Sequence, residues 1–147
     1  MRIFILEDDE RRIKIFTNKL KDHTLELATS VDQAKSILLK NKETPFDVLF
    51  LDHDLDGMVF VNSEWDNTGY QLVKYIVENK ILYGYAVIHS QNPDGAKAMH
   101  DLLPHSLEIP FIVLELFLFK DDVNNKLAAF NILSKMNKWE KILLFQL

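Results

Sequence analysis

Acidic or imidazole side chains follow a short apolar run at three points of the chain. The three groups are Glu7-Asp8-Asp9, Asp52-His53-Asp54 and His89-Ser90. Carboxylates at the end of a buried strand are costly to desolvate, and a divalent cation is the most direct compensation. Carboxylate oxygens predict Mg or Mn, and the neighbouring histidines also admit Zn, Fe or Ni. A metal is therefore expected where these groups meet.

The candidate metal ligands are four carboxylates: Glu7, Asp8, Asp9 and Asp52. Three successive acids cannot easily all bind one ion, so one of the first three is expected to cap the following helix instead. Asp52 has a structural alternative as well, an ion pair with an arginine of that helix.

The candidate catalytic groups are His89, His53 and Asp54. Near neutral pH an imidazole can protonate an alkoxide leaving group or complete the coordination of a metal. Along a straight strand Asp54 shares a face with Asp52, and His53 points to the opposite face unless the strand end bends. His89 also has a plain structural interpretation, as a half-buried histidine that donates to a carbonyl.

Four further side chains are candidates for binding a phosphate-containing substrate: Ser90, Asn92, Thr68 and Tyr70. Ser90 can donate to a phosphate oxygen or simply belong to a turn. Asn92 is equally well explained as the N-cap of a helix whose first residue is proline. The start of that helix, which includes Gly95, can present N–H groups to a phosphate. Tyr70 is either a core residue or a ligand contact, and Gly69 before it is expected to permit close helix packing.

Five apolar runs predict the strands that position these groups: residues 3–6, 25–27, 46–51, 85–88 and 107–111. Amphipathic segments between them predict helices, the second of them capped by Ser30. This regular alternation implies one parallel sheet covered on both faces. Because ligands of such sheets bind beyond the carboxyl ends of the strands, the three polar groups converge if the strand order is 2-1-3-4-5.

Three segments leave alternatives open. Residues 57–67 form a polar and aromatic loop, long for a strand-to-helix connection, that could fold as a hairpin or a lid. Residues 112–119 either extend the last strand or form a buried helix, and a clearer helix pattern begins at residue 121. The apolar runs 112–119 and 142–145 leave surface for a homodimer or for a C-terminal segment that folds back.

Length and composition are typical of one globular domain over residues 1–147. Residues 112–147 are expected to form a C-terminal helical extension, whose structure the sequence leaves open. The net charge of −5 is unsuited to duplex nucleic acid, and the absence of cysteine excludes disulfides and thiolate metal sites. The N-terminus does not resemble a signal peptide, and no apolar run has the length of a membrane span. A soluble cytoplasmic protein without membrane contact is therefore expected.

Several of these groups resemble the receiver domain of two-component signalling. Glu7-Asp8-Asp9 is similar to its acidic metal-binding cluster, Asp52 to its phospho-accepting aspartate, and Ser90 to the hydroxyl residue after strand four. Two positions depart from the pattern, since Ile109 stands where receivers have lysine and Ser106 where they have the switching aromatic residue. Loss of the lysine removes a charge-assisted contact to an aspartyl phosphate.

The chain resembles the cyclic-phosphate processing receiver family more closely. The motifs that carry this resemblance lie within residues 1–103: Leu6-Glu7-Asp8-Asp9-Glu10, Leu51-Asp52-His53-Asp54-Leu55, Thr68-Gly69-Tyr70, His89-Ser90-Gln91-Asn92-Pro93-Asp94-Gly95, and Met99. The resemblance implies a three-layer α/β fold of the flavodoxin and receiver type, and an activity on cyclic phosphates.

Residues and resemblance together predict a metal-dependent phosphoesterase that opens a cyclic phosphate, in a small cyclic nucleotide or at an RNA end. One alternative is a binding module that captures a cyclic nucleotide without cleaving it. Site histidines and carboxylates favour catalysis, since a protein that only sequesters phosphate more often uses Arg and Lys. The other alternative is an atypical receiver phosphorylated on Asp52, against which Ile109 argues.

Overall fold

Five parallel strands form a single sheet, in the order β2-β1-β3-β4-β5. The computed structural model describes residues 1–103 and 105–119, with side chains described as far as Glu115. The strands are β1 (Arg2–Leu6), β2 (Thr24–Ala28), β3 (Phe46–Leu51), β4 (Tyr83–Ile88) and β5 (Ser106–Glu108). The strand order predicted from the sequence is thereby confirmed.

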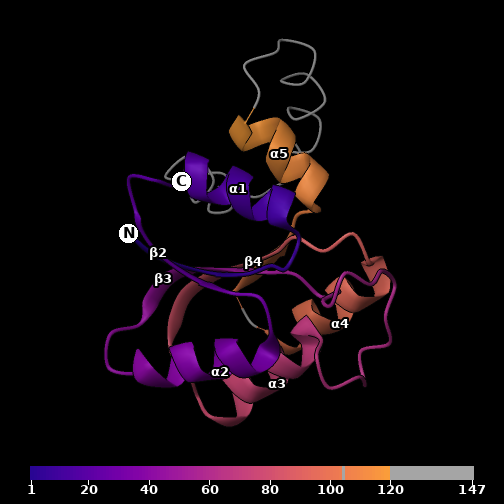
Figure 1. Cartoon of the computed structure of the whole chain (residues 1–147). Helices are drawn as coiled ribbons and strands as arrows, with labels where there is room; N and C mark the ends of the chain where they lie inside the picture. The colour runs from indigo at the N-terminus through magenta and orange to yellow at the C-terminus, as the bar shows by residue number, and fades with distance from the viewer. Residues whose placement is uncertain (104, 120–147) are drawn as a thin grey trace.

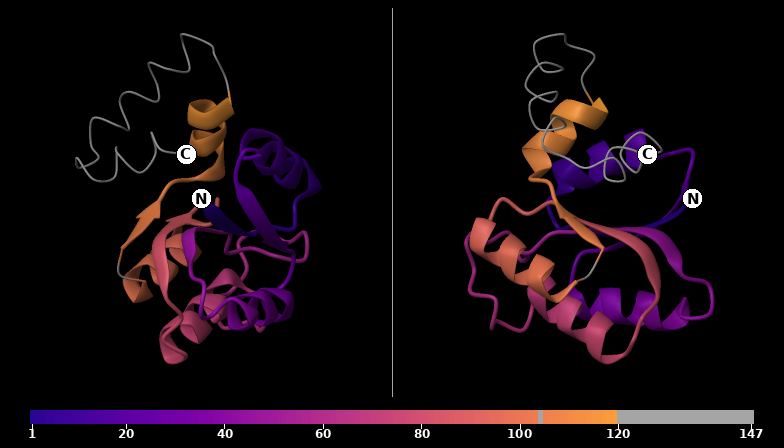
Figure 2. Two further views of the ribbon diagram at one scale, coloured as in Figure 1. Left: turned by 90° about the vertical axis from the view of Figure 1, so that its left-hand side faces the viewer. Right: turned by 180° about the vertical axis from the view of Figure 1, so that it is seen from behind.

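Helices cover both faces of the sheet and complete three layers. Figures 1 and 2 show α1 (Glu10–Lys19) and α5 (Phe111–Phe119) on one face, and α2 (Val31–Lys40), α3 (Gly69–Glu78) and α4 (Pro93–Leu102) on the other. Alternate residues of β1 enter the two cores, because successive side chains of a strand point to opposite faces. Ile3 and Ile5 pack with α1 and α5, whereas Phe4 and Leu6 pack with the other three helices.

Side chains that were considered as caps begin three of the helices. Asp9 accepts from the backbone N–H of Arg12 at 3.0 Å and caps α1. Ser30 caps α2, and Asn92 caps α4 by accepting from the N–H of Gly95 at 3.0 Å. Each cap satisfies a backbone donor that the first turn of a helix leaves without a partner.

The last strand is shorter than predicted: the prediction of a strand over residues 107–111 was wrong for its C-terminal residues. β5 ends at Glu108, and Phe111 already begins α5. The carbonyl of Pro110 accepts from the N–H groups of Val113 and Leu114, so this proline stands at the helix start, where its missing N–H costs nothing. Residues 111–119 are therefore a helix. The helix pattern from residue 121 and the run 142–145 lie outside the described residues.

Candidate metal centre

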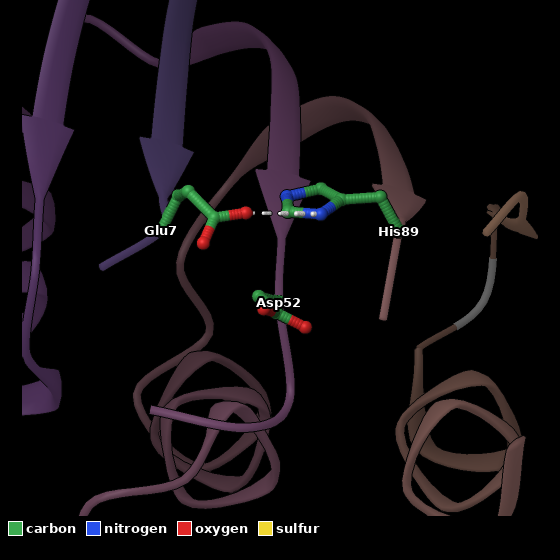
Figure 3. A group of neighbouring side chains, drawn as sticks. All are labelled: Glu7, Asp52 and His89. Atoms are coloured by element: carbon green, nitrogen blue, oxygen red, sulfur yellow. Dashed lines mark ion pairs between the residues drawn. The ribbon is translucent and has the colours of Figure 1, made fainter. Parts of the chain in front are cut away.

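The three polar groups meet at the carboxyl edge of the sheet, as the sequence predicted. Leu6 pairs with Leu51, and Leu51 pairs with Ile88, so the residues that follow them lie side by side. Figure 3 shows Glu7 and His89 pointing toward each other, with Asp52 between their strands. One ligand atom from each of these three residues lies within 4.8 Å of the other two, and all three residues are buried.

His89 occupies a pocket lined by aromatic rings. Its ring centroid is 5.2 Å from that of Phe16 and 6.0 Å from that of Phe111, and the residue is 0% exposed. Within the described part of the chain neither ring nitrogen has a hydrogen-bond partner, and Nδ1 lies 3.6 Å from Oε2 of Glu7. Burial lowers the pKa of His89 to about 3, so the imidazole is neutral and one ring nitrogen offers a lone pair. These contacts favour a metal ligand over a general acid.

Glu7 and Asp52 are two buried carboxylates that share one arginine. Burial, and then the neighbouring Asp52, raise the pKa of Glu7 to about 7. Burial also raises the pKa of Asp52. Nη1 of Arg12 lies 2.9 Å from Oδ2 of Asp52 and 3.4 Å from Oε2 of Glu7. One guanidinium does not balance two ionised carboxylates, and a divalent cation beside the neutral His89 fits this donor set.

A cleft opens at this edge of the sheet. Its lining includes the predicted ligands Asp8 and Asp9, the carboxylate of Asp54, and residues 57–60 of the long loop. The side chain of Asp8 accepts from the N–H of Gly57 at 2.7 Å and fastens this loop over the cleft. Asp9 is the acid of its group that caps the helix. Of the other two predicted ligands in that group, Glu7 joins the close ligand atoms of Asp52 and His89, whereas Asp8 lines the cleft outside that cluster.

Ser90 lies on the wall of this acidic cleft. Its hydroxyl bonds to the carboxylate of Asp52 and accepts from the N–H of Asn92 at 3.1 Å. A phosphate in the cleft would meet this hydroxyl. The predicted ligand contacts Thr68 and Tyr70 lie elsewhere: the hydroxyl of Thr68 donates to the carbonyls of Ser63 and Trp65, and Tyr70 packs against the core.

His53 does not line the acidic cleft, although it was predicted as a catalytic group. Its Nδ1 lies 2.6 Å from Oδ1 of Asp54 and its Nε2 lies 2.9 Å from the hydroxyl of Ser63. Asn92, predicted to bind substrate, donates to Asp54 at 2.9 Å. Partial burial opposes the ionisation of Asp54, but these hydrogen bonds outweigh it and lower its pKa. The hydrogen bonds among His53, Asp54, Ser63 and Asn92 therefore join the long loop to the start of α4.

Two glycines permit this packing. A Cβ on Gly69 would overlap the carbonyl oxygen of Asp52, which confirms the prediction of close helix packing. A Cβ on Gly95 would overlap the imidazole of His53. The N–H of Gly95 is already bonded to Asn92, so this donor is not free for a phosphate. The loop itself is closed at its base by a bridge between Asp54 and Thr68, as in a small hairpin.

Arg12 is the site residue that the sequence did not single out. An arginine of the first helix was considered there only as a structural partner of Asp52. Its position in the sequence could have indicated its role. Arg12 lies three residues after the cap Asp9, so the first turn of α1 brings it back toward the acidic group. Its distance from both buried carboxylates depends on the fold and not on the local sequence.

Fold and site together define a receiver-type domain with a modified centre. Residues 2–105 match the family of the cyclic-phosphate processing receiver domain, and the chain belongs to this family. A search of curated proteins found no match. Within the described residues, no helix has both the length and the apolar character to cross a lipid bilayer.

Solved receiver domains share the fold at low sequence identity. The receiver domain from Methylobacillus flagellatus is 21% identical, with a TM-score of 0.51 over 75% of this chain and 86% of its own. The non-phosphorylated HemR receiver domain from Leptospira biflexa is 17% identical, with a TM-score of 0.53 over 93% and 96%. The Mn²⁺-bound form of the response regulator Rcp1 is 16% identical, with a TM-score of 0.52 over 87% and 88%.

Proposed function

We propose that the protein is a metal-dependent phosphoesterase that opens a cyclic phosphate, in a cyclic nucleotide or at an RNA end. The observation that carries this proposal is His89, a neutral imidazole that points at two buried carboxylates and has no hydrogen-bond partner among the described residues. Membership of the cyclic-phosphate processing family supports the substrate class. The proposed site of action is intracellular.

The donor set of the proposed centre consists of Glu7, Asp52 and His89. Two oxygens and one imidazole nitrogen suit Mn, Fe, Ni or Zn better than Mg or Ca, which prefer oxygen alone. The Mn²⁺-bound receiver Rcp1 is a protein of the same fold that takes a divalent cation. A cation bound here would lower the pKa of a water molecule and neutralise phosphoryl oxygens.

The chain's own polar groups orient the substrate. Arg12 and the hydroxyl of Ser90 line the acidic cleft and offer donors to the non-bridging phosphate oxygens. Asp8, which also lines the cleft, would accept the proton of the attacking water and return it to the leaving oxygen as the ring opens. His89 keeps its neutral form and holds no proton for the leaving oxygen. An acidic cleft repels phosphate without a cation, which also argues against duplex nucleic acid as a partner.

A phosphorylated receiver is the weaker candidate, because the contact that would hold an aspartyl phosphate is missing. Ile109 occupies the lysine position; it is 4% exposed, and its N–H donates to the carbonyl of Ile88. No lysine lines the acidic cleft in the described residues. Asp52 itself is 3% exposed and paired with Arg12, which obstructs attack on a phosphodonor.

Phosphorus NMR of the protein with Mn²⁺ and a panel of 2′,3′- and 3′,5′-cyclic nucleotides tests the proposal. We expect a new phosphomonoester signal that chelation abolishes. A shifted substrate signal that returns unchanged after denaturation would contradict catalysis and support capture. If no cyclic phosphate reacts or binds, while a small phosphodonor labels Asp52, the protein is a receiver.

A further inference from the structure

We propose that Arg12 competes with the metal for the site. In the metal-free protein Arg12 holds Glu7 and Asp52, and when the cation binds Arg12 moves to the substrate phosphate. The inference rests on the proposed function and goes beyond it, because it describes how metal and phosphate binding are coupled.

Arg12 and the cation require the same two carboxylates, and Oε2 of Glu7 faces both of them. Nη1 of Arg12 lies 2.9 Å from Oδ2 of Asp52 and 3.4 Å from Oε2 of Glu7. The same Oε2 lies 3.6 Å from Nδ1 of His89, so it belongs to the proposed ligand set as well. A guanidinium and a divalent cation this close in a buried site repel each other strongly. Metal binding must therefore displace Arg12 from at least one of the two carboxylates.

The resting position of Arg12 leaves its hydrogen-bonding capacity incompletely used. Its Nε is buried and has no partner within the part of the chain that the structure describes. Its guanidinium carbon lies 5.0 Å from the centre of the Phe111 ring, a cation–π contact that does not satisfy an N–H. A phosphate can accept from two guanidinium nitrogens at once, which would use this donor.

Arg12 reaches the acidic cleft without moving its backbone. The backbone N–H of Arg12 donates to the cap Asp9 at 3.0 Å. Its side chain is 12% exposed and lines the cleft together with Ser90. Rotation of the flexible side chain is enough to exchange a carboxylate for a phosphate oxygen. Phosphate then takes Arg12 from the carboxylates that the metal needs, so each ligand strengthens the binding of the other.

The test is the affinity for Mn²⁺, measured by calorimetry with and without inorganic phosphate, in wild type, Arg12→Gln and Arg11→Gln. Arg11 is the matched control, because it lies next to Arg12 on α1 but pairs with Glu115 at the surface, its side chain 59% exposed. Arg12→Gln is expected to bind Mn²⁺ about 10-fold or more tightly, within the usual range of coupling between two ligands. Arg11→Gln is expected to match wild type.

Phosphate provides the second readout. It is expected to raise the Mn²⁺ affinity of wild type about 5-fold or more, and to have less than about half that effect in Arg12→Gln. Arg12→Lys keeps the competing charge and loses the two-nitrogen contact, so its Mn²⁺ affinity should stay weak while the coupling falls.

Two outcomes overturn the inference, and they are distinguishable. Mn²⁺ binding that is no tighter in Arg12→Gln than in wild type, with both proteins folded by circular dichroism, contradicts the competition alone. An absence of Mn²⁺ binding in every variant contradicts the metal centre itself, and with it the proposed function.

Discussion

Replacement of Asp52 by asparagine should lower the rate of metal-dependent cyclic-phosphate hydrolysis by at least about 100-fold. Loss of a hydrogen-bond partner of a metal ligand costs up to about that factor, and Asp52 is proposed as a ligand itself. Asparagine keeps the shape of the side chain and removes the charge that a cation needs. Burial raises the pKa of Asp52, and in the variant the carboxylate of Glu7 still lies beside Arg12, so loss of this charge should leave the metal-free protein folded. Initial rates at saturating Mn²⁺, followed by phosphorus NMR, measure the effect.

The matched control is Asp47→Asn on the same strand. Asp47 is exposed near the other end of β3, where its carboxylate accepts from the N–H of Arg2 at 2.7 Å. An amide oxygen can replace that acceptor, so this variant should hydrolyse at the wild-type rate. Equal rates in wild type and Asp52→Asn would remove Asp52 from the proposed mechanism.

The stability of the metal-free protein should respond to pH in opposite directions through Glu7 and His89. Burial raises the pKa of Glu7 from 4.5 to about 7, so its contribution to the free energy of unfolding is complete below pH 4.5 and is lost as the pH rises through 7. Burial lowers the pKa of His89 from 6.5 to about 3, so its contribution is complete above pH 6.5 and is lost as the pH falls.

Two single variants separate these contributions between pH 4.5 and 6.5. Each shifted group changes stability by about 1.4 kcal/mol per pH unit between its folded and unfolded pKa. Relative to wild type, Glu7→Gln should therefore gain about 2.5 kcal/mol of stability as the pH rises over this range. Relative to wild type, His89→Gln should lose about the same amount. The wild type changes less than either, because the two contributions oppose each other.

Urea unfolding in the presence of a chelator, at half-unit steps of pH, measures these slopes. Differences from wild type cancel the titration of every group that the substitutions leave undisturbed. Curves for the two variants that run parallel to wild type would show that neither group is titrated with the shifts described above.

The sequence predicted the sheet, and the edge at which the acidic groups meet, because both follow from local patterns. Apolar runs that end in charged residues indicate buried strands with polar carboxyl ends, and their alternation with helices indicates a parallel sheet. The boundary of β5 was predicted less well, since apolar residues continue past Glu108 on both sides of Pro110. Pro110 stands before a helix whose residues Phe111 and Leu114 pack in one core cluster with Phe16 of α1.

The orientation of the two histidines could not be predicted from the sequence. His53 and His89 each lie at the end of a neighbouring strand, yet they face different surroundings. His89 enters a pocket made by Phe16 of α1 and Phe111 of α5, residues distant in the sequence. His53 instead contacts Ser63 in the long loop. Tertiary packing decides which histidine faces the buried carboxylates, and it also places Arg12.

The central claim is that His89 joins the carboxylates as a metal ligand, and pulsed electron paramagnetic resonance of the Mn²⁺-loaded protein tests it most directly. A nitrogen coupling from a directly bound imidazole is expected in wild type. This coupling should vanish in His89→Gln and persist in His53→Gln, because His53 lies at the end of the adjacent strand and faces away from the carboxylates. An absence of nitrogen coupling in wild type, or a coupling that survives His89→Gln, would contradict it.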